Sequence, residues 1–232
     1  LNWRVLDIIQ DDNGNDYVRL ISETPTTSTL KLYDYNGYNN AVYLLDKTCN
    51  TFYNKIGYAK NVQNLKIEDI EKYMKTKPTL SGQTVSTTYK KYPSILLQEE
   101  NQTVDGTTGE LGLSEQTEQI KQTTVQTALS WNLKTTYYNQ TMTTDSFIDA
   151  KYYNLFINDG TNNLPIYWMS SRCVSADSGN AGFGVRRVHT ASVSASRLYY
   201  SKDEPYGYAF ALRPVITLKS DILIDAEESG DG

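Results

Sequence analysis

The chain has 232 residues, a formal net charge of -5 and a sequence pI near 5.0. Its 39% hydrophobic and 21% charged residues exclude a disordered chain, and its length is enough to bury a core without disulfide staples. The acidic balance excludes nucleic acid and anionic membrane surfaces as the main partner. The 19 tyrosines, against 5 phenylalanines, indicate a β-rich binding protein, because tyrosine favours strands and recognition surfaces.

Cysteine and histidine are too scarce for several kinds of chemistry. Two cysteines, Cys49 and Cys173, and one histidine exclude zinc fingers, ribbons and deaminase-type zinc sites. A Ser–His–Asp triad would have to use His189, which lies in a segment of variable character. Cys49 falls on the apolar face of a predicted helix, so two buried thiols are favoured over a disulfide bond. We therefore expect no metal, no cofactor and no catalytic residue.

The N-terminal segment predicts a β-hairpin. Residues 3–10 and 17–23 are alternating or apolar runs on either side of an Asp/Asn cluster at 11–16. Asn13-Gly14 in this cluster tolerates positive φ, which is typical of hairpin turns. The cluster could also be read as a calcium loop, but it lacks the regular alternation and terminal Glu of an EF-hand. An ordinary turn is the favoured interpretation.

Two helices and a polar insertion follow. Apolar residues at helical spacing predict an amphipathic helix over residues 40–54, with Asn as a suitable N-cap. A shorter helix is predicted over residues 66–75. From about 76 to 127 the chain is rich in Thr, Gln, Ser and Gly, which predicts a long insertion of loops with short strands, one of them at 94–97.

The last third of the chain predicts strands. Residues 166–170, 183–188, 191–200 and 208–218 are apolar or alternating, and we expect them to form successive antiparallel strands. Pro214 in the last of them indicates an edge position or a bend. Helices early and strands late predict an α+β fold, and we expect a single domain over residues 1–232 with a C-terminal antiparallel sheet and long irregular loops.

A repeating pattern between residues 174 and 209 carries the most information about function. Apolar residues occupy roughly every second position, which indicates one fixed core face, and the residues between them share no chemical theme. A half-exposed sheet with ordinary turns would also give this pattern. The interleaved positions that we predict to contact a ligand are Ser175, Asp177, Ser178, Asn180, Gly182, Gly184, Arg187, His189, Ser192, Ser194, Ser196, Arg197, Tyr200, Asp203 and Tyr206.

The genetic code sharpens the choice between these interpretations. Randomising both adenines of an Asn codon gives Asn, Ser, Gly, Asp, Tyr, His, Arg, Thr, Ala and Pro, among others, but never Trp, Met, Gln, Glu or Lys. Every interleaved position named above holds a residue of the reachable set. Lys202 and Glu204 do not, so they would be fixed positions. This bias is what adenine-directed mutagenesis of an Asn-rich template produces.

The segments that flank this stretch resemble a known family. The stretch is opened by Tyr-Trp-Met-Ser-Ser-Arg-Cys-Val at 167–174 and closed by Tyr-Ala-Phe-Ala-Leu-Arg-Pro-Val at 208–215, and residues 3–6, 35–42 and 65–70 add upstream similarity. Together they are similar to variable proteins of diversity-generating retroelements, which have a C-type-lectin-like fold of the formylglycine-generating-enzyme type. The closing Arg-Pro-Val strand also recurs in lectin-like domains that are not diversified.

The resemblance implies a stable scaffold that presents a hypervariable patch, at about 174–209, to a protein or glycan on a cell surface. It implies a protein that is secreted, displayed on a cell surface or associated with a virion. Because the chain opens at Leu1, we expect an export signal or anchor to have been removed, and no stretch of the chain itself is apolar enough to insert into a membrane.

Four alternatives remain beside this interpretation. Formylglycine-type oxidation needs a close pair of copper-binding cysteines, which this chain does not match, so we do not expect an enzyme. Hydrolysis by carboxylates could use Asp145, Asp149, Asp159 or Asp177, but nothing in the sequence fixes a pair. A structural or adhesin subunit of a phage tail or bacterial surface structure would have the same fold without diversification. A lectin-type calcium site would call for a Glu-Pro-Asn or Gln-Pro-Asp tripeptide, and the chain has only the partial match Glu-Pro-Tyr at 204–206.

Overall fold

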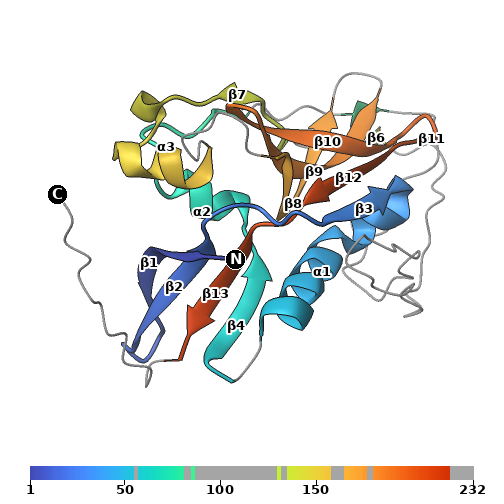
Figure 1. Ribbon diagram of the computed structural model, residues 1–232. Helices are drawn as coiled ribbons and strands as arrows, with labels where there is room; N and C mark the ends of the chain where they lie inside the picture. Colours follow the sequence, from blue (N-terminus) through green and yellow to red (C-terminus); the bar gives the residue numbers. More distant parts are fainter. Residues whose placement is uncertain are drawn as a thin grey trace.

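The structure is a computed structural model that describes residues 1–54, 57–80, 85–86, 130–131, 135–157, 165–176 and 180–219. Within these ranges it shows two main β-sheets and a separate two-stranded pair, with helices packed beside the main sheets, so the fold class is α+β, as predicted (Figure 1). The predicted insertion at 76–127, with its strand at 94–97, lies almost wholly outside the described residues.

The described elements follow one another in three groups. The first group is β1 (Trp3–Gln10), β2 (Asp16–Ser22), β3 (Thr29–Tyr33), α1 (Asp34–Tyr53), β4 (Ala59–Asn64) and α2 (Ile67–Glu71). The second is β5 (Val85–Ser86), β6 (Ser130–Trp131), β7 (Gln140–Thr141), the 3-10 turn η2 (Thr144–Ser146) and α3 (Ala150–Phe156). The third is β8 (Tyr167–Ala176), β9 (Ala181–His189), β10 (Ser192–Tyr200), β11 (Glu204–Pro205), β12 (Gly207–Ala211) and β13 (Pro214–Leu218).

The N-terminal hairpin is confirmed, and its Asp/Asn cluster forms the turn. Strands β1 and β2 pair antiparallel, and Gly14 has a φ of +83°. The carboxylate of Asp11 accepts hydrogen bonds from the backbone N–H groups of Asn13 and Asn15 and from the hydroxyl of Tyr17. These bonds hold the pKa of Asp11 near 2, and they use its oxygens to close the turn.

The strands form a small four-stranded sheet, a large sheet and a separate antiparallel pair of β5 with β6. The small sheet has the order β1-β2-β13-β4, and the large one has the order β11-β10-β9-β8-β12-β3, with β7 beside β10. Strands β8, β9 and β10 are antiparallel neighbours, as predicted. The prediction is wrong for β12, which runs parallel to β8 through the pair Ala211 and Tyr167 and antiparallel to β3.

The predicted strand over residues 208–218 is two strands in different sheets. Strand β12 belongs to the large sheet and β13 to the small one, and Pro214 is the first residue of β13. The break is stabilised by Arg213, a buried residue whose guanidinium donates hydrogen bonds to the carbonyls of Ser22, Glu23 and Leu155. The bend expected at Pro214 is therefore confirmed, and it connects the two sheets.

Both predicted helices are present, with different bounds. Helix α1 begins at Asp34, six residues before its predicted start at residue 40, so the expected N-cap Asn40 lies inside it and donates to the carbonyl of Asn36. At the start of α1, the Asp34 carboxylate accepts a hydrogen bond from the N–H of Tyr35. Helix α2 ends at Glu71 rather than at residue 75.

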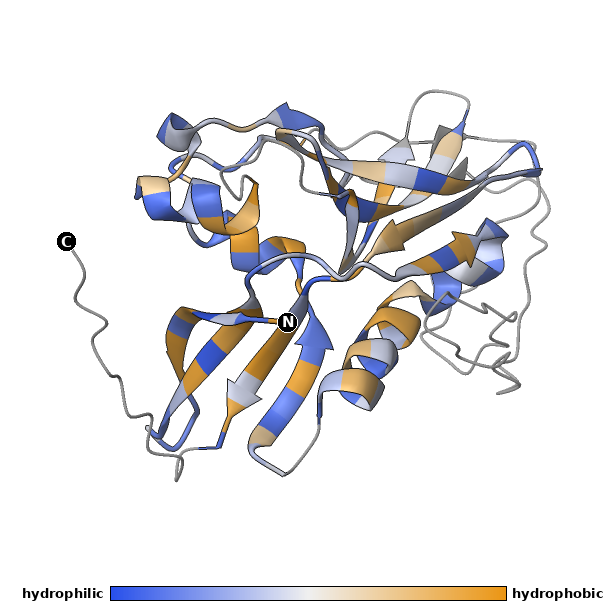
Figure 2. Ribbon diagram, in the orientation of Figure 1, coloured by the Kyte–Doolittle hydropathy of each residue, from blue (hydrophilic) through white to orange (hydrophobic). Residues whose placement is uncertain are grey.

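Two apolar cores support the sheets. The first lies between α1 and the large sheet and includes Leu45, Trp168 and Phe183. The second lies around α2 and α3 and includes Ile70 and Phe156. Figure 2 shows bands of apolar residues alternating with polar ones along β2 and β4, as expected for strands with one buried face.

The two cysteines are buried, separate thiols, as predicted. The Sγ atom of Cys49 lies 3.8 Å from the side-chain oxygen of Asn64 in the first core. Cys173 lies on β8. Burial raises the pKa of both thiols, to about 11 for Cys173 and well above the ordinary value for Cys49.

A buried polar junction fixes the position of β8. The side-chain amide of Asn64 donates to the carbonyl of Trp168 at 2.8 Å. The carboxylate of Asp46 on α1 accepts from the Ser170 hydroxyl at 2.6 Å and from the backbone N–H of Asn64 at 2.9 Å. Burial raises the pKa of Asp46. These bonds connect α1, β4 and β8 at the point where β8 enters the large sheet.

Candidate functional site

Five of the predicted contact positions share one face of the large sheet. Gly182 on β9 is paired with Ser175 on β8 and with Tyr200 on β10. Gly184 is paired with Arg197 in the same way. Directly opposite residues in a sheet point to the same side, so these five positions form a continuous strip across three strands.

The two glycines allow β10 to lie close to β9. A Cβ atom at Gly182 would lie 2.8 Å from Cδ of Arg197, so the arginine side chain crosses over this glycine. A Cβ atom at Gly184 would lie 2.8 Å from the backbone oxygen of Ser196. The first obstacle is a flexible side chain and the second is backbone, so only Gly184 is fixed by the strands themselves.

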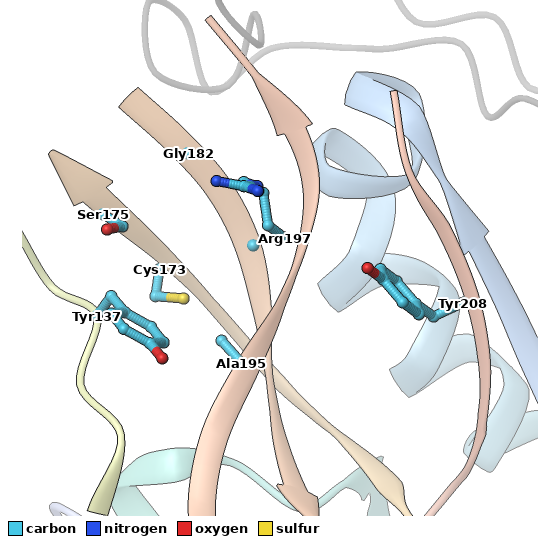
Figure 3. A pocket seen from close by; sticks show the side chains of 8 residues that line it. Tyr137, Cys173, Ser175, Gly182, Ala195, Arg197 and Tyr208 are labelled. Atoms are coloured by element: carbon cyan, nitrogen blue, oxygen red, sulfur yellow. The ribbon is translucent and has the colours of Figure 1, made fainter. Parts of the chain in front are cut away.

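The glycine strip forms part of a pocket of about 250 Å³. Its lining residues are Tyr137, Cys173, Ser175, Gly182, Gly184, Ala195, Arg197 and Tyr208. In Figure 3 the phenol rings of Tyr137 and Tyr208 lie on opposite sides, with Cys173, Ala195 and Arg197 between them. The lining contains aromatic rings, hydroxyls and one guanidinium but no carboxylate.

Arg197 is held by aromatic rings rather than by an acid. Its guanidinium lies 4.6 Å from the ring centre of Tyr200 and 5.1 Å from that of Tyr206. The Tyr206 hydroxyl donates to the carboxylate of Glu204 at 2.9 Å, and this bond raises the pKa of Tyr206. None of the ion pairs formed by the described residues involves Arg197. The rings of Tyr200 and Tyr206 therefore hold the guanidinium in place, and no carboxylate of the described residues neutralises its charge.

Arg187 brings a second positive charge close to the pocket. Its guanidinium lies 5.3 Å from the ring centre of Phe210, and burial lowers its pKa. It interacts electrostatically with the phenol groups of Tyr208 and Tyr137, both of which line the pocket. Its Nε atom is buried and has no hydrogen-bond partner.

The other predicted positions do not join the pocket. Ser194 and Ser196 are only 6% and 4% exposed, so the expectation that they face solvent is wrong. His189 and Ser192 lie at the other end of the β9–β10 hairpin, where the Ser192 hydroxyl donates to the His189 carbonyl. Asp203, in the turn after β10, accepts a hydrogen bond from the hydroxyl of buried Tyr199. Asn180 is half-buried at the start of β9, and Asp177 and Ser178 lie outside the described residues.

The alternating pattern of residues 174–209 does not identify one exposed face, because both faces of the β9–β10 hairpin are partly covered. Phe183 and Val185 pack in the first core, whereas Val188 and Val193, from the opposite face, pack in the second. In addition, the register of β10 shifts between Arg197 and Tyr199, which interrupts the strict alternation there. A single solvent-facing side over residues 174–209 is therefore not what the strands form.

Four residues of the pocket wall were not among the predicted contact positions: Tyr137, Cys173, Ala195 and Tyr208. Tyr137 is held against β8, because its N–H donates to the carbonyl of Val174 at 3.0 Å. The guanidinium of Arg186 donates to the carbonyls of Thr136 and Tyr138 and so fixes the same segment. The excess of tyrosine in the composition was the available signal, but it does not identify individual positions.

The alternative sites receive no geometric support from the described residues. Asp149 caps α3 by accepting a hydrogen bond from the N–H of Lys151, which lowers its pKa, and Asp145 lies in η2. Asp159 lies outside the described residues, as does Asp177. Across the described ranges, no group of three or more His, Cys, Asp or Glu side chains is placed to hold a metal ion.

The same part of the chain contains no helix with the length and apolar character needed to cross a membrane.

Comparison with known proteins adds no relative. No protein-family model matches the chain, and neither a curated protein nor a solved structure matches it. The function has to be inferred from the pocket and from the pattern of residues around it.

Proposed function

We propose that this chain is a non-catalytic ligand-binding protein that displays a diversified recognition surface on a C-type-lectin-like scaffold, as in the variable proteins of diversity-generating retroelements. The observation that carries the proposal is the lining of one pocket by Ser175, Gly182, Gly184 and Arg197. All four belong to the interleaved positions, and each holds a residue that adenine-directed mutagenesis of an Asn codon can produce.

The surroundings of the pocket favour recognition. Tyr200 and Tyr206 flank Arg197, and tyrosine and arginine are the residues that most often supply binding energy at recognition surfaces. Behind them, Trp168 and Phe183 are fully buried in the first core. Exposed side chains on such a support can be exchanged at a cost to stability of about 0.5 kcal/mol or less.

The proposed partner is a protein or glycan on a cell surface, met by a protein that is itself displayed on a cell, secreted or carried on a virion. Capture from bacterial surface extracts tests this role. We would compare the natural chain with the triple variant Arg197→Ala, Tyr200→Ala and Tyr206→Ala.

A matched control removes the same residue types elsewhere. The triple variant Arg4→Ala, Tyr43→Ala and Tyr58→Ala changes one exposed arginine and two exposed tyrosines that do not line the pocket. Loss of capture by the pocket variant alone supports the proposal. Equal capture by all three proteins would remove the proposed site.

Diversification has its own test in the neighbouring DNA. A near-copy of the codons for residues 170–215, differing almost only at adenines and lying beside a reverse-transcriptase gene, is expected. Clonal isolates should differ mainly at the interleaved positions. Variation spread evenly over buried positions such as Phe183 would instead favour an undiversified structural or adhesin subunit.

A further inference from the structure

The arginines at the pocket differ from Arg4 and Arg19 in having no acidic partner. Arg19 is paired with Asp7 and Asp69, each at 2.6 Å. Neither Arg187 nor Arg197 takes part in any ion pair among the residues that the structure describes. Arg197 lines the pocket, and Arg187 lies beside it, within electrostatic range of Tyr137 and Tyr208. In a chain with a net charge of -5, these two guanidiniums without acidic partners make the surroundings of the pocket locally positive.

Arg187 strengthens this electrostatic argument. A partly buried charge without a counter-charge is costly, which is why burial lowers the pKa of Arg187. The buried Nε–H group of Arg187 has no hydrogen-bond acceptor, which is a further energetic cost. A bound anion would offset the unfavourable charge, and no carboxylate among the lining residues competes with it.

The volume and the lining of the pocket restrict the kind of molecule that could bring the anionic group. Its volume of about 250 Å³ lies below the roughly 300–1,000 Å³ of sites for drug-sized ligands, so it suits one ring-sized group. Tyr137 and Tyr208 offer flat ring faces beside hydroxyls, which suits a sugar ring with its apolar C–H face and polar edge. Strand β9, which provides Gly182 and Gly184, is paired on both sides, so a peptide cannot add to it as a further strand.

We propose that this pocket binds a carboxylated sugar, such as a uronic acid residue of a surface polysaccharide. The Arg197 guanidinium pairs with the sugar carboxylate, Arg187 supplies the second positive charge, and the tyrosines contact the ring. This inference rests on the proposed binding function, and it names the ligand class for the same site.

The test is calorimetric titration with trimers of galacturonic, glucuronic and mannuronic acid. The matched ligands are the methyl esters of the same trimers, which keep the sugar and lose the charge. We expect at least one acid trimer to bind and its ester to bind roughly tenfold more weakly or worse, since hydrogen bonds to charged groups are the strong ones. Added salt should weaken binding of the acid form, because it screens exposed charges.

The protein variants locate the contact. Arg197→Met should weaken binding roughly 10- to 100-fold, and Arg4→Met, which removes an exposed arginine in the other sheet, should bind as the natural chain does. Arg197 is exposed, so its replacement leaves the core intact, and a thermal unfolding curve checks this. Arg187→Met, which keeps an apolar contact with Phe210, should weaken binding in the same direction.

Several results would overturn the inference. They are no binding by any of the three acid trimers, equal binding of acid and ester, and equal or tighter binding of hexaglutamate or inorganic sulfate than of the sugars. Failure here is distinct from failure of the binding role. If the trimers do not bind but the pocket variant still loses capture of surface extracts, only the ligand class is rejected.

Discussion

The backbone N–H of Arg213 donates a 2.7 Å hydrogen bond to the side-chain oxygen of Asn64, and both residues are fully buried. The side-chain NH2 group of Asn64 donates in turn to the carbonyl of Trp168 on β8. One side chain therefore joins the connection between the two sheets to the strand that carries the pocket wall.

Replacing Asn64 should destabilise the whole fold. Asn64→Leu keeps a similar volume but leaves the Arg213 N–H and the Trp168 carbonyl without partners. Each unsatisfied buried group costs about 1–3 kcal/mol, so the free energy of unfolding should fall by about 2–5 kcal/mol. Urea denaturation measures the change. Asn61→Leu, at an exposed position of the same strand, should change it by less than about 1 kcal/mol, and equal losses would contradict the role of the junction.

The Asp7 carboxylate should make stability depend on acid pH. Burial alone would raise its pKa, but hydrogen bonds from Arg19, Lys72 and Tyr73 outweigh burial and hold the pKa near 2. A carboxyl with a lowered pKa in the folded state contributes stability above its unfolded pKa, and this contribution is lost as the pH falls from about 4 to about 2.

Asp7→Asn should therefore reduce stability at neutral pH and flatten the curve in that acid range. Denaturation curves at several pH values measure this, and Asp145→Asn, at an exposed carboxylate, provides the comparison. Parallel pH curves for the Asp7 variant and the natural chain would rule out this role for Asp7.

The two glycines of the pocket should respond differently to the same substitution. Gly184→Ala brings a methyl group against the backbone oxygen of Ser196, so β10 must shift and stability should fall by about 1–3 kcal/mol. Gly182→Ala meets the side chain of Arg197, which can move, so the loss should be smaller. Thermal unfolding distinguishes the two. If the natural chain is diversified, we expect Gly184 to stay constant in functional variants while residue 182 changes.

Both thiols should be unreactive in the folded protein. Burial raises the pKa of Cys49 and of Cys173, so little thiolate forms near neutral pH, and the two residues are only 0% and 3% exposed. Titration with a chromogenic disulfide reagent should give no fast reaction in native buffer and two thiols per chain after denaturation. Rapid native labelling of either cysteine would show that its site opens.

Local sequence patterns were enough for the elements that are local in the structure. The turn at Asn13-Gly14 and the strands on either side of it depend on neighbouring residues, and they were predicted correctly. Pro214 marked the bend between the two sheets for the same reason. The start of α1 was misplaced because its first turn contains Asn36 and Gly37, which sequence patterns associate with loops.

The pocket could be predicted only in part. The interleaved pattern identified Ser175, Gly182, Gly184 and Arg197, which lie on adjacent strands of one antiparallel meander. Tyr137 and Tyr208 come from segments on either side of it, and no periodicity indicates that they meet there. The buried serines on β10 were misjudged, because a polar residue in an alternating stretch gives no sign that its face is also covered. Ser196 is paired with Val185, which packs in the first core.

The parallel pair between Tyr167 and Ala211 has a consequence for how the protein can evolve. Everything between these two residues, including the whole interleaved stretch, leaves the scaffold and returns to it at adjacent points. The two ends of the segment thus lie side by side, and we expect exchange of the entire unit between homologous chains to transfer every lining residue of the pocket except Tyr137 in one event.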